Sequence, residues 1–402
     1  MDRYQEAGRL VTNFIESGFV FHPVASRQAK VCEEFQAEFG YEALKETPKD
    51  KILMKVFHSD GEESSMLYLL EYKDKYLDLG SIKGGSPNKY PVYMNKGKWY
   101  TGVLKNKREL SFEEASDIAQ FAVDQILAAL ELVERSKFDT VQDYVLFEKK
   151  LREKIDKYAG YAWVRKYLYM NYPEVFVPFY NDEWIRKAVM CFLVKPEDTY
   201  YGRVGQLIKM VETTEYDVIH FTQTIYKIFG CMIDVHFYRI NSDFEGKSYA
   251  DEWKKKGMIA LPTKQVRSLD SCYEKMMDGK ENIIKSLKEQ YGADDKAAKR
   301  MANQFDAYYK ARNEDWAVDV FVVMSGSKLV ALADRVGEYR YAAIEDLPHI
   351  RSISWVSEFT DKDRLPNASE GLGELCVEIK DEDNLLYLYE KYFYDCNKLG
   401  IK

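Results

Sequence analysis

The sequence predicts a multidomain α+β protein whose last part is a small curled sheet or open barrel with helices. Its 402 residues exceed the length of one ordinary domain, so two or three domains are expected. Short strand-like runs such as Val320-Phe-Val-Val-Met324 and Leu329-Val-Ala-Leu-Ala333 are joined by the turn Ser325-Gly-Ser-Lys328. Helical patterns separate the other runs. An ordinary α+β core with aromatic residues inside is the simpler explanation of the same pattern.

Composition excludes several classes of protein. The chain is 46% hydrophobic and 31% charged, which is typical of a globular protein rather than a disordered one. No apolar run approaches the ~18 residues needed to span a membrane, and the N-terminus lacks the pattern of a signal peptide. The six cysteines include no Cys-x-x-Cys pair and the five histidines are dispersed. We therefore expect a cytoplasmic protein with reduced thiols, no metal site and no cofactor.

Residues 1–135 are predicted to form an N-terminal α+β domain. Helical spacing indicates two helices before residue 40. The runs Ile52-Leu-Met-Lys-Val-Phe57 and Met66-Leu-Tyr-Leu-Leu-Glu-Tyr72 then predict a β-hairpin. The domain ends in a helix with a clear start, because Ser111 and Glu114 form a Ser-x-x-Glu capping box ahead of apolar residues at helical spacing.

Residues 137–232 are predicted to form a helical domain. Apolar residues recur at helical spacing in five segments, and prolines such as Pro178 separate them. The segment is rich in aromatic residues, most of which we expect in the core. A minority can face a groove, with Arg165, Lys166, Arg186 and Lys187 beside them.

Residues 235–402 are predicted to form the third domain, which ends in an acidic extension. The net charge of the whole chain is −8, which argues against a protein that coats nucleic acid. Charge is uneven, however: residues 235–312 hold 16 lysines and arginines against 12 acidic residues, and residues 357–402 hold 6 against 11. Aromatic residues and arginines gather at strand ends in the more basic part. This mixture suits a site that stacks a flat base and holds phosphates.

Three blocks of sequence resemble one family. The blocks contain Leu79-Gly-Ser-Ile-Lys-Gly-Gly85, Trp163-Val-Arg-Lys-Tyr-Leu168, and Gly337-Glu-Tyr-Arg-Tyr341 with His349-Ile-Arg-Ser-Ile-Ser-Trp355. In this order they resemble the N-terminal region of McrB-type proteins, the AAA+ GTPase subunits of modification-dependent restriction systems. The third block is similar to the PUA-like (EVE/YTH-related) domains that read modified bases. The resemblance covers most of residues 50–358.

The resemblance implies a recognition module of an McrBC-type anti-phage restriction system. Such a module reads a flipped base of modified DNA in an aromatic pocket, and stacking and edge hydrogen bonds offset the cost of unstacking. The implied partners are DNA, an AAA+ GTPase module in cis or in trans, and an McrC-like nuclease. The candidate pocket walls are Tyr238, Trp253, Trp316, Tyr339, Tyr341 and Trp355. The candidate phosphate contacts are Arg239, Lys254, Lys255, Arg340 and Arg351.

The sequence departs from the family at three places, one of which is Val318-Asp319, where the family usually has Gly-Asp before the central strand. The family's Gly-Trp after the Ile-Ala strand is replaced here, because Leu261 is followed by Pro262-Thr263. The AAA+ phosphate loop is also missing. Gly246-Lys-Ser248 has the right ending, but Asn241 stands where the first glycine is needed and a polar loop precedes it. We therefore expect no nucleotide hydrolysis by this chain and a loop at 246–248.

Two other functions remain open. A PD-(D/E)xK-type nuclease needs an acid on one strand and Glu-x-Lys on the next, to hold Mg²⁺. Asp60 with Glu71 and Lys73, on the predicted hairpin, fits that pattern loosely. The other alternative is a protein-interaction module of a defence complex. No Ser-His-Asp or Cys-His arrangement supports a hydrolase.

Overall fold

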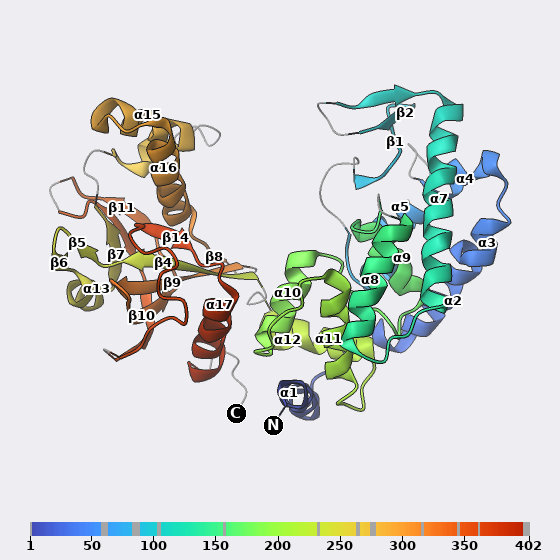
Figure 1. Ribbon diagram of the computed structural model, residues 1–402, viewed down its shortest axis with the longest axis horizontal. Coiled ribbons are helices and arrows are strands. Elements are labelled where there is room, and N and C mark those ends of the chain that lie inside the picture. Colours follow the sequence, from blue (N-terminus) through green and yellow to red (C-terminus); the bar gives the residue numbers. More distant parts are fainter. Residues whose placement is uncertain are drawn as a thin grey trace. The chain divides into compact units, whose positions relative to one another are not determined.

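The computed structural model forms two compact units, Met1–Ile228 and Phe229–Lys402 (Figure 1). It describes residues 2–57, 63–82, 89–102, 106–155, 158–230, 234–262, 266–273, 279–314, 317–343, 346–360 and 362–396. About 53% of the chain is helical and 15% is in strands, spread over several small sheets. The predicted class, a multidomain α+β protein, is therefore confirmed.

Unit 1 is mainly helical and contains one three-stranded antiparallel sheet in the order β1-β2-β3. Its first elements are α1 (Arg3–Glu16), η1 (Ala25–Arg27), α2 (Gln28–Phe39), α3 (Tyr41–Lys45), α4 (Lys49–Val56), α5 (Met66–Tyr72), α6 (Asp74–Leu77), β1 (Tyr93–Asn95), β2 (Lys98–Thr101) and β3 (Arg108–Leu110). They are followed by α7 (Phe112–Glu134), α8 (Val141–Ile155), α9 (Ala162–Asn171), α10 (Asp182–Cys191), α11 (Tyr200–Val211) and α12 (Val218–Phe229). The boundary predicted near residue 136 falls inside this unit, where α7 packs against α8.

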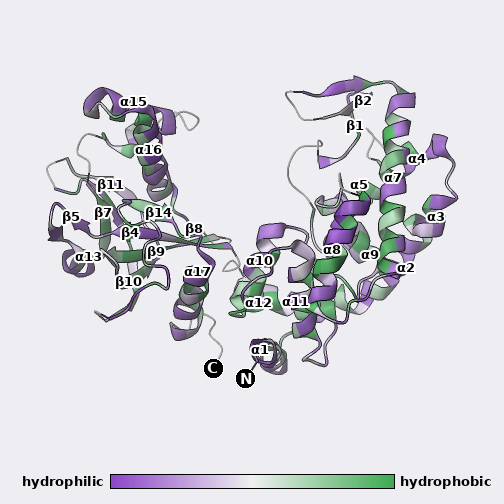
Figure 2. Ribbon diagram, viewed as in Figure 1, coloured by the Kyte–Doolittle hydropathy of each residue, from purple (hydrophilic) through white to green (hydrophobic). Residues whose placement is uncertain are grey.

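Helix α7 begins where the capping box predicts. The Ser111 hydroxyl accepts a hydrogen bond from the Glu114 backbone N–H at 3.1 Å, and the Glu114 carboxylate accepts one from the Ser111 N–H at 2.8 Å. Hydrophobic and hydrophilic residues alternate along the helix (Figure 2). Its apolar face, from Ala115 to Val133, is buried against neighbouring helices of unit 1, including α4 and α8. The local capping signal and the apolar face thus agree, which explains why this prediction is confirmed.

The β-hairpin predicted before residue 73 is wrong, because both runs form helices. Ile52, Leu53 and Val56 point to one buried face of α4. The second run begins as α5 at Ser65, whose hydroxyl caps the helix by accepting from the Tyr68 N–H. Apolar runs this short fit a strand or a helix equally well, and here the i, i+1, i+4 spacing with a polar cap selects the helix.

Unit 2 contains two main sheets and a short hairpin. Its first elements are β4 (Val235–Asn241), β5 (Asp243–Phe244), β6 (Lys247–Ser248), α13 (Ala250–Lys256), β7 (Met258–Leu261), α14 (Leu269–Cys272), α15 (Gly279–Tyr291), α16 (Asp295–Lys310) and β8 (Asn313–Glu314). They are followed by β9 (Ala317–Ser325), β10 (Lys328–Asp334), β11 (Tyr339–Tyr341), β12 (His349–Ser352), β13 (Ser354–Glu358), β14 (Cys376–Glu378), α17 (Glu382–Tyr389) and the π-helical turn η4 (Glu390–Asp395). The larger sheet has the order β13-β10-β9-β4-β14, with β8 beside β9, and the smaller has the order β11-β12-β7. β4 and β9 run parallel, and every other pair is antiparallel.

The two sheets of unit 2 share one core. The chain passes from β12 into β13 through Ile353 alone, so a nearly continuous strand belongs first to the smaller sheet and then to the larger. Ile353 also donates its N–H to the Gly257 carbonyl at 3.0 Å. Residues of both sheets and of α16, such as Ile350, Phe321 and Phe305, are buried together. This is a curled arrangement of short strands with helices, as the strand-like runs predict.

Within the described part of the chain, no helix is long and apolar enough to cross a membrane. The five cysteines in that part are all free thiols.

Candidate functional site

A cleft of about 520 Å³ lies in unit 2 between α16 and the strands β4 and β14. Its lining residues are Tyr238, Arg300, Asn303, Gln304, Asp306, Ala307, Lys310, Arg312, Asp319, Glu374, Cys376, Val377, Glu378 and Lys380. The volume is in the range of small-molecule sites, roughly 300–1,000 Å³. Among the residues chosen from the sequence, Tyr238 alone lines it.

Tyr238 is the aromatic residue of this cleft. It alternates along β4 with Phe237 and Arg239, so it shares a face with His236, and the two rings stack with centroids 6.4 Å apart. Burial raises the pKa of Tyr238, and the carboxylates of Asp319 and Glu378 add to the shift. At neutral pH the Tyr238 hydroxyl is therefore a protonated hydrogen-bond donor on a half-buried side chain that lines the cleft.

The charged residues of the cleft form matched pairs. Arg300 pairs with Glu374, Lys310 with Asp306 at 2.7 Å, Arg312 with Asp319 at 3.2 Å, and Lys380 with Glu378 at 3.6 Å. The side chains of Arg300, Lys310 and Lys380 are 63%, 58% and 77% exposed. Their carboxylate partners Glu374, Asp306 and Glu378 are only 17%, 20% and 34% exposed, so a bound group can reach the cation of each pair from solvent but not the carboxylate as easily. The cleft offers both donors and acceptors with no large net charge.

Two of the predicted pocket walls, Tyr339 and Tyr341, meet elsewhere, around His349. The Tyr339 hydroxyl lies 2.7 Å from His349 Nδ1 and accepts from the Leu269 N–H at 3.0 Å. The Tyr341 ring lies 5.2 Å from the His349 ring, and Tyr309 contacts Tyr339 edge to face at 5.3 Å. We call Tyr273, Tyr309, Tyr339, Tyr341 and His349 the tyrosine cluster. It adjoins the cleft at Asp306, which accepts from the Tyr273 hydroxyl and pairs with Lys310.

The three predicted tryptophans do not form a pocket among the described residues. Trp253 lies on α13 and is fully buried in the core, so it cannot be an open wall in this conformation. Trp355 is partly buried on β13, and its indole N–H, like that of Trp253, has no acceptor in the described part of the chain. Trp316 lies outside the described residues.

Two of the predicted phosphate contacts are buried structural arginines. Arg239 is 2% exposed, and its guanidinium donates to the carbonyls of Ala368, Glu370 and Gly326. Arg351 is 7% exposed and donates to the carbonyls of Tyr308, Tyr309, Ala311 and Gly337. In this conformation neither guanidinium can reach a phosphate, because each is buried and its two terminal NH groups donate to backbone carbonyls.

The other predicted phosphate contacts lie at the surface. Lys255 and Arg340 are exposed. Lys254 pairs with Glu358 at 3.1 Å, which ties α13 to β13. Arg340 lies on β11 between Tyr339 and Tyr341, so it points away from the two tyrosines. These three cations do not line the cleft.

The nuclease alternative loses the hairpin that it requires. Glu71 and Lys73 lie on and just after helix α5, and Asp60 lies outside the described residues. Glu71 is buried and accepts from Lys89 and from the Tyr90 hydroxyl, both at 2.5 Å. Lys73 instead pairs with Glu63 at 3.0 Å. Within the described residues no group of three His, Cys, Asp or Glu side chains could hold a metal ion.

Of the loop predicted at 246–248, Gly246 lies in a hairpin turn, whereas Lys247 and Ser248 form strand β6, which pairs with β5. Glu245 and Gly246 both have positive φ angles, 50° and 79°, which is the pattern of the tight turn that best joins antiparallel strands. Lys247 and Ser248 lie in a strand, and helix α13 begins only at Ala250, so the geometry differs from a phosphate-binding loop, in which the helix starts at the Lys-Ser/Thr pair.

The basic residues of the Trp163–Leu168 motif in unit 1 are mostly buried. Lys166 is fully buried, and its ammonium donates to the carbonyls of Leu70, Tyr76 and Gly80 at 2.6–2.8 Å. Arg165 is 8% exposed, donates to the Tyr180 carbonyl at 2.8 Å, and stacks over the Tyr200 ring at 3.7 Å. Lys187 is also buried, whereas Arg186 pairs with Glu183 at the surface.

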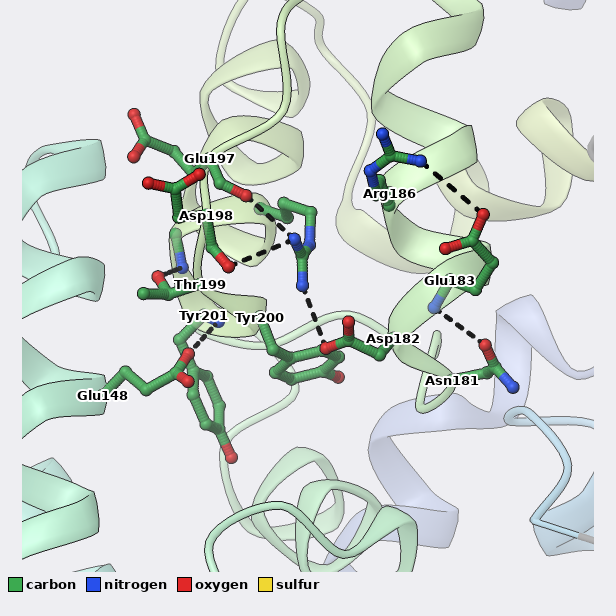
Figure 3. A network of polar contacts seen from close by, with 12 residues as sticks. Glu148, Asn181, Asp182, Glu183, Arg186, Glu197, Asp198, Thr199, Tyr200 and Tyr201 are labelled. Carbon is green, nitrogen blue, oxygen red and sulfur yellow. Dashed lines mark hydrogen bonds and ion pairs between the residues drawn. The ribbon is translucent and has the colours of Figure 1, made fainter. Parts of the chain in front are cut away.

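A polar network near Arg165 fixes the start of α11 (Figure 3). Figure 3 shows Asp182 beside the Tyr200 ring. It also shows the Glu148 carboxylate next to the Tyr201 backbone, and this carboxylate accepts a hydrogen bond from the Tyr201 N–H at 2.7 Å. Asp182 also pairs with Arg203 at 2.9 Å, and Arg203 donates to the Glu197 carbonyl. These contacts hold the loop before α11 and the helices α8, α10 and α11 together, so we assign this network a structural role.

Unit 1 also has an apolar groove of about 680 Å³. The segment after α1 forms one wall and α12 forms another. Val20 is 84% exposed there, and Tyr226 is 50% exposed. None of the residues chosen from the sequence as site residues lines it.

Most residues that line the cleft are not among the site residues predicted from the sequence. Three of them lie on α16 or just after it, namely Arg300, Lys310 and Arg312. The strongly amphipathic pattern of this segment could have indicated that its polar face borders a site. Asp319 lies within β9 between two valines. An acidic residue in an apolar strand is expected to have a cationic partner, and here that partner is Arg312. No sequence signal indicates that β14 carries Glu378 beside Tyr238, because that pairing joins residues far apart in the chain.

Comparison with known proteins finds no family model, no curated protein and no solved structure that matches this chain. The fold and the cleft define a two-unit α+β protein with one mixed-charge, aromatic-containing cleft in its second unit.

Proposed function

We propose that unit 2 is a nucleic-acid recognition module and that the cleft beside α16 accepts a single nucleobase. The observation that carries this proposal is the placement of Tyr238, an aromatic ring in a cleft whose rim carries four cations. Aromatic side chains stack on any base and contribute about 1–3 kcal/mol per base.

The lining of the cleft matches the chemistry of a base. A nucleobase is flat and neutral, and its edges present donors and acceptors side by side. The carboxylates of the cleft can accept from exocyclic amino groups, and Asn303 can do either. Ala307 and Val377 add apolar surface to the cleft that Tyr238 lines. A site for a free anion would instead show an excess of cations.

The exposed cations of the rim suit the flanking phosphates. Arg300, Lys310 and Lys380 are held in place by carboxylates but remain more than half exposed. A base that leaves a duplex stays attached to two phosphates, which can exchange with these carboxylates. The resemblance to McrB-type readers favours modified DNA as the ligand, with an AAA+ GTPase module and an McrC-like nuclease as partners.

The test is binding of the full chain to oligonucleotides with and without methylated bases, at fixed salt. We expect Tyr238→Ala to lower affinity about ten-fold or more, and Tyr238→Phe to retain it, because stacking needs the ring. Tyr341→Ala, in the tyrosine cluster, is the matched control and should change affinity little. Thermal melts of each variant exclude unfolding as the cause.

Three results would contradict the proposal. The folded chain could bind none of the oligonucleotides, which would leave the protein-interaction module as the better explanation. Tyr238→Ala could bind as well as the unchanged chain. The loss could also follow Tyr341→Ala instead, which would move the site to the tyrosine cluster.

A further inference from the structure

A small pocket at the C-terminal end of α7 in unit 1 has a different chemistry from the cleft. Its volume is about 340 Å³, and it is lined by Tyr41, Leu130, Glu131, Glu134, Arg135 and Tyr172. Two aromatic rings and two carboxylates therefore line one cavity. The only cation among the lining residues is Arg135.

The two carboxylates of the pocket are oriented by the two tyrosines. The Tyr41 hydroxyl donates to Glu131 Oε1 at 2.8 Å, and the Tyr172 hydroxyl donates to Glu134 Oε1 at 2.5 Å. Burial and the hydrogen bond to Glu134 raise the pKa of Tyr172, so its hydroxyl remains a donor at neutral pH. Each glutamate is thus held through its Oε1 atom, and Glu131 Oε2 lies 3.6 Å from the Arg135 guanidinium, so a ligand at Glu131 would compete with Arg135.

The position of these glutamates on α7 costs stability. The last turn of a helix carries partial negative charge, so basic residues are favoured there. Helix α7 has 23 residues and no basic residue in its last turn, and that turn holds Glu131 and Glu134. A cation bound between them would relieve the repulsion. Side chains placed against the helix dipole and held there by hydrogen bonds indicate a role other than folding.

We propose that this pocket binds a cationic group, either an alkylammonium or a guanidinium. Carboxylates form charge-assisted hydrogen bonds with such groups, and tyrosine ring faces attract them. The chemistry is shared by a free polyamine and by a lysine or arginine side chain of a partner protein. This inference concerns unit 1 and does not depend on the function proposed for unit 2.

Two cationic side chains of the chain itself lie near the pocket and would compete with a cationic ligand. Arg135 approaches Glu131 at 3.6 Å, but its side chain is 77% exposed, so it closes the pocket only loosely. Lys45 lies over the Tyr41 ring at 5.1 Å. Glu174 adds a further negative charge near Tyr172. Arg135 therefore acts as a weak internal competitor that a ligand displaces.

The experiment is titration calorimetry of the full chain with two probes, spermidine and N-acetyl-arginine amide. We expect Glu131→Gln with Glu134→Gln to weaken binding about ten-fold or more, since both carboxylates contact the cation. Arg135→Ala should strengthen binding. The matched control is Glu113→Gln, an exposed glutamate in the first turn of the same helix, which should bind as the unchanged chain does.

The two probes separate the possible sources of the cation. Spermidine binding alone supports a polyamine, and binding of the arginine amide supports a partner's side chain. The proposal is overturned if neither probe binds. It is also overturned if the double glutamine variant, still folded by its thermal melt, binds as well as the unchanged chain, or if Arg135→Ala weakens binding.

Discussion

The motif around Lys166 in unit 1 and the cleft beside α16 in unit 2 use cationic side chains in opposite ways. Lys166 is fully buried and donates to three backbone carbonyls. Arg300 and Lys380 are exposed and pair with carboxylates that can be exchanged for a ligand. A cation buried against carbonyls fixes the backbone and cannot reach a ligand without local unfolding. An exposed paired cation can reach one.

The difference shows that a basic residue in a motif is not in itself a sign of anion binding. In unit 2 the buried Arg239 and Arg351 resemble Lys166 of unit 1 more than they resemble the cleft cations, because carbonyls surround each of them. The distinction predicts that buried cations control stability and that rim cations control binding.

Lys166→Met should have the largest effect, a loss of about 3–9 kcal/mol in the free energy of unfolding, because three carbonyls lose their donor at about 1–3 kcal/mol each. Urea denaturation of the full chain measures this loss. Lys150→Met is the matched control, since Lys150 is exposed on α8, and it should change stability little. Equal stability of the two variants would show that the carbonyls find other donors.

Arg351→Met should lower the free energy of unfolding by about 2–4 kcal/mol, because the carbonyls that it serves are left without a donor. Arg340→Met, on the adjacent strand β11, removes an exposed charge and should leave stability nearly unchanged. The measurement is urea denaturation followed by a signal from unit 2. If Arg351→Met stays fully stable but binds nucleic acid with a smaller salt dependence, Arg351 is a phosphate contact after all.

The protonation of Lys166 should make stability depend on pH. Burial lowers the pKa of Lys166 to about 7, below its unfolded value of about 10.4. Between these values the unfolded chain binds more protons, so stability should rise with pH by up to about 1.4 kcal/mol per unit. Comparing the chain with Lys166→Met from pH 7 to pH 9 isolates this contribution. A constant difference would mean that the carbonyls and nearby Glu71 keep the ammonium charged.

Much of the fold could be predicted where several signals agree. The capping box of α7 precedes an apolar pattern at helical spacing, and the apolar runs of β9 and β10 flank a tight turn, so in each case a local cue agrees with the hydrophobic pattern. The segments that form α4 and α5 are short apolar stretches, which do not distinguish a helix from a strand. The N-cap at Ser65 is the local cue that indicates a helix for α5. Local cues decide such segments more reliably than hydrophobicity.

Less of the candidate site could be predicted, because it depends on long-range pairing. Tyr238 could be chosen for its aromatic ring at a strand, but its neighbours Glu378 and Arg312 meet it only through the pairing of β4 with β14 and β9. Residue type also could not show that Arg351 is buried and Lys380 is exposed, because burial is a property of the folded chain.

The central claim, that the cleft beside α16 accepts a base, is tested most directly by photocrosslinking. A bound oligonucleotide carrying 5-iododeoxyuridine reacts under ultraviolet light with the aromatic ring on which that base stacks, and mass spectrometry identifies the residue. We predict a crosslink at Tyr238 that disappears in Tyr238→Leu. A crosslink at Tyr341 or Trp355, with none at Tyr238, would contradict the claim.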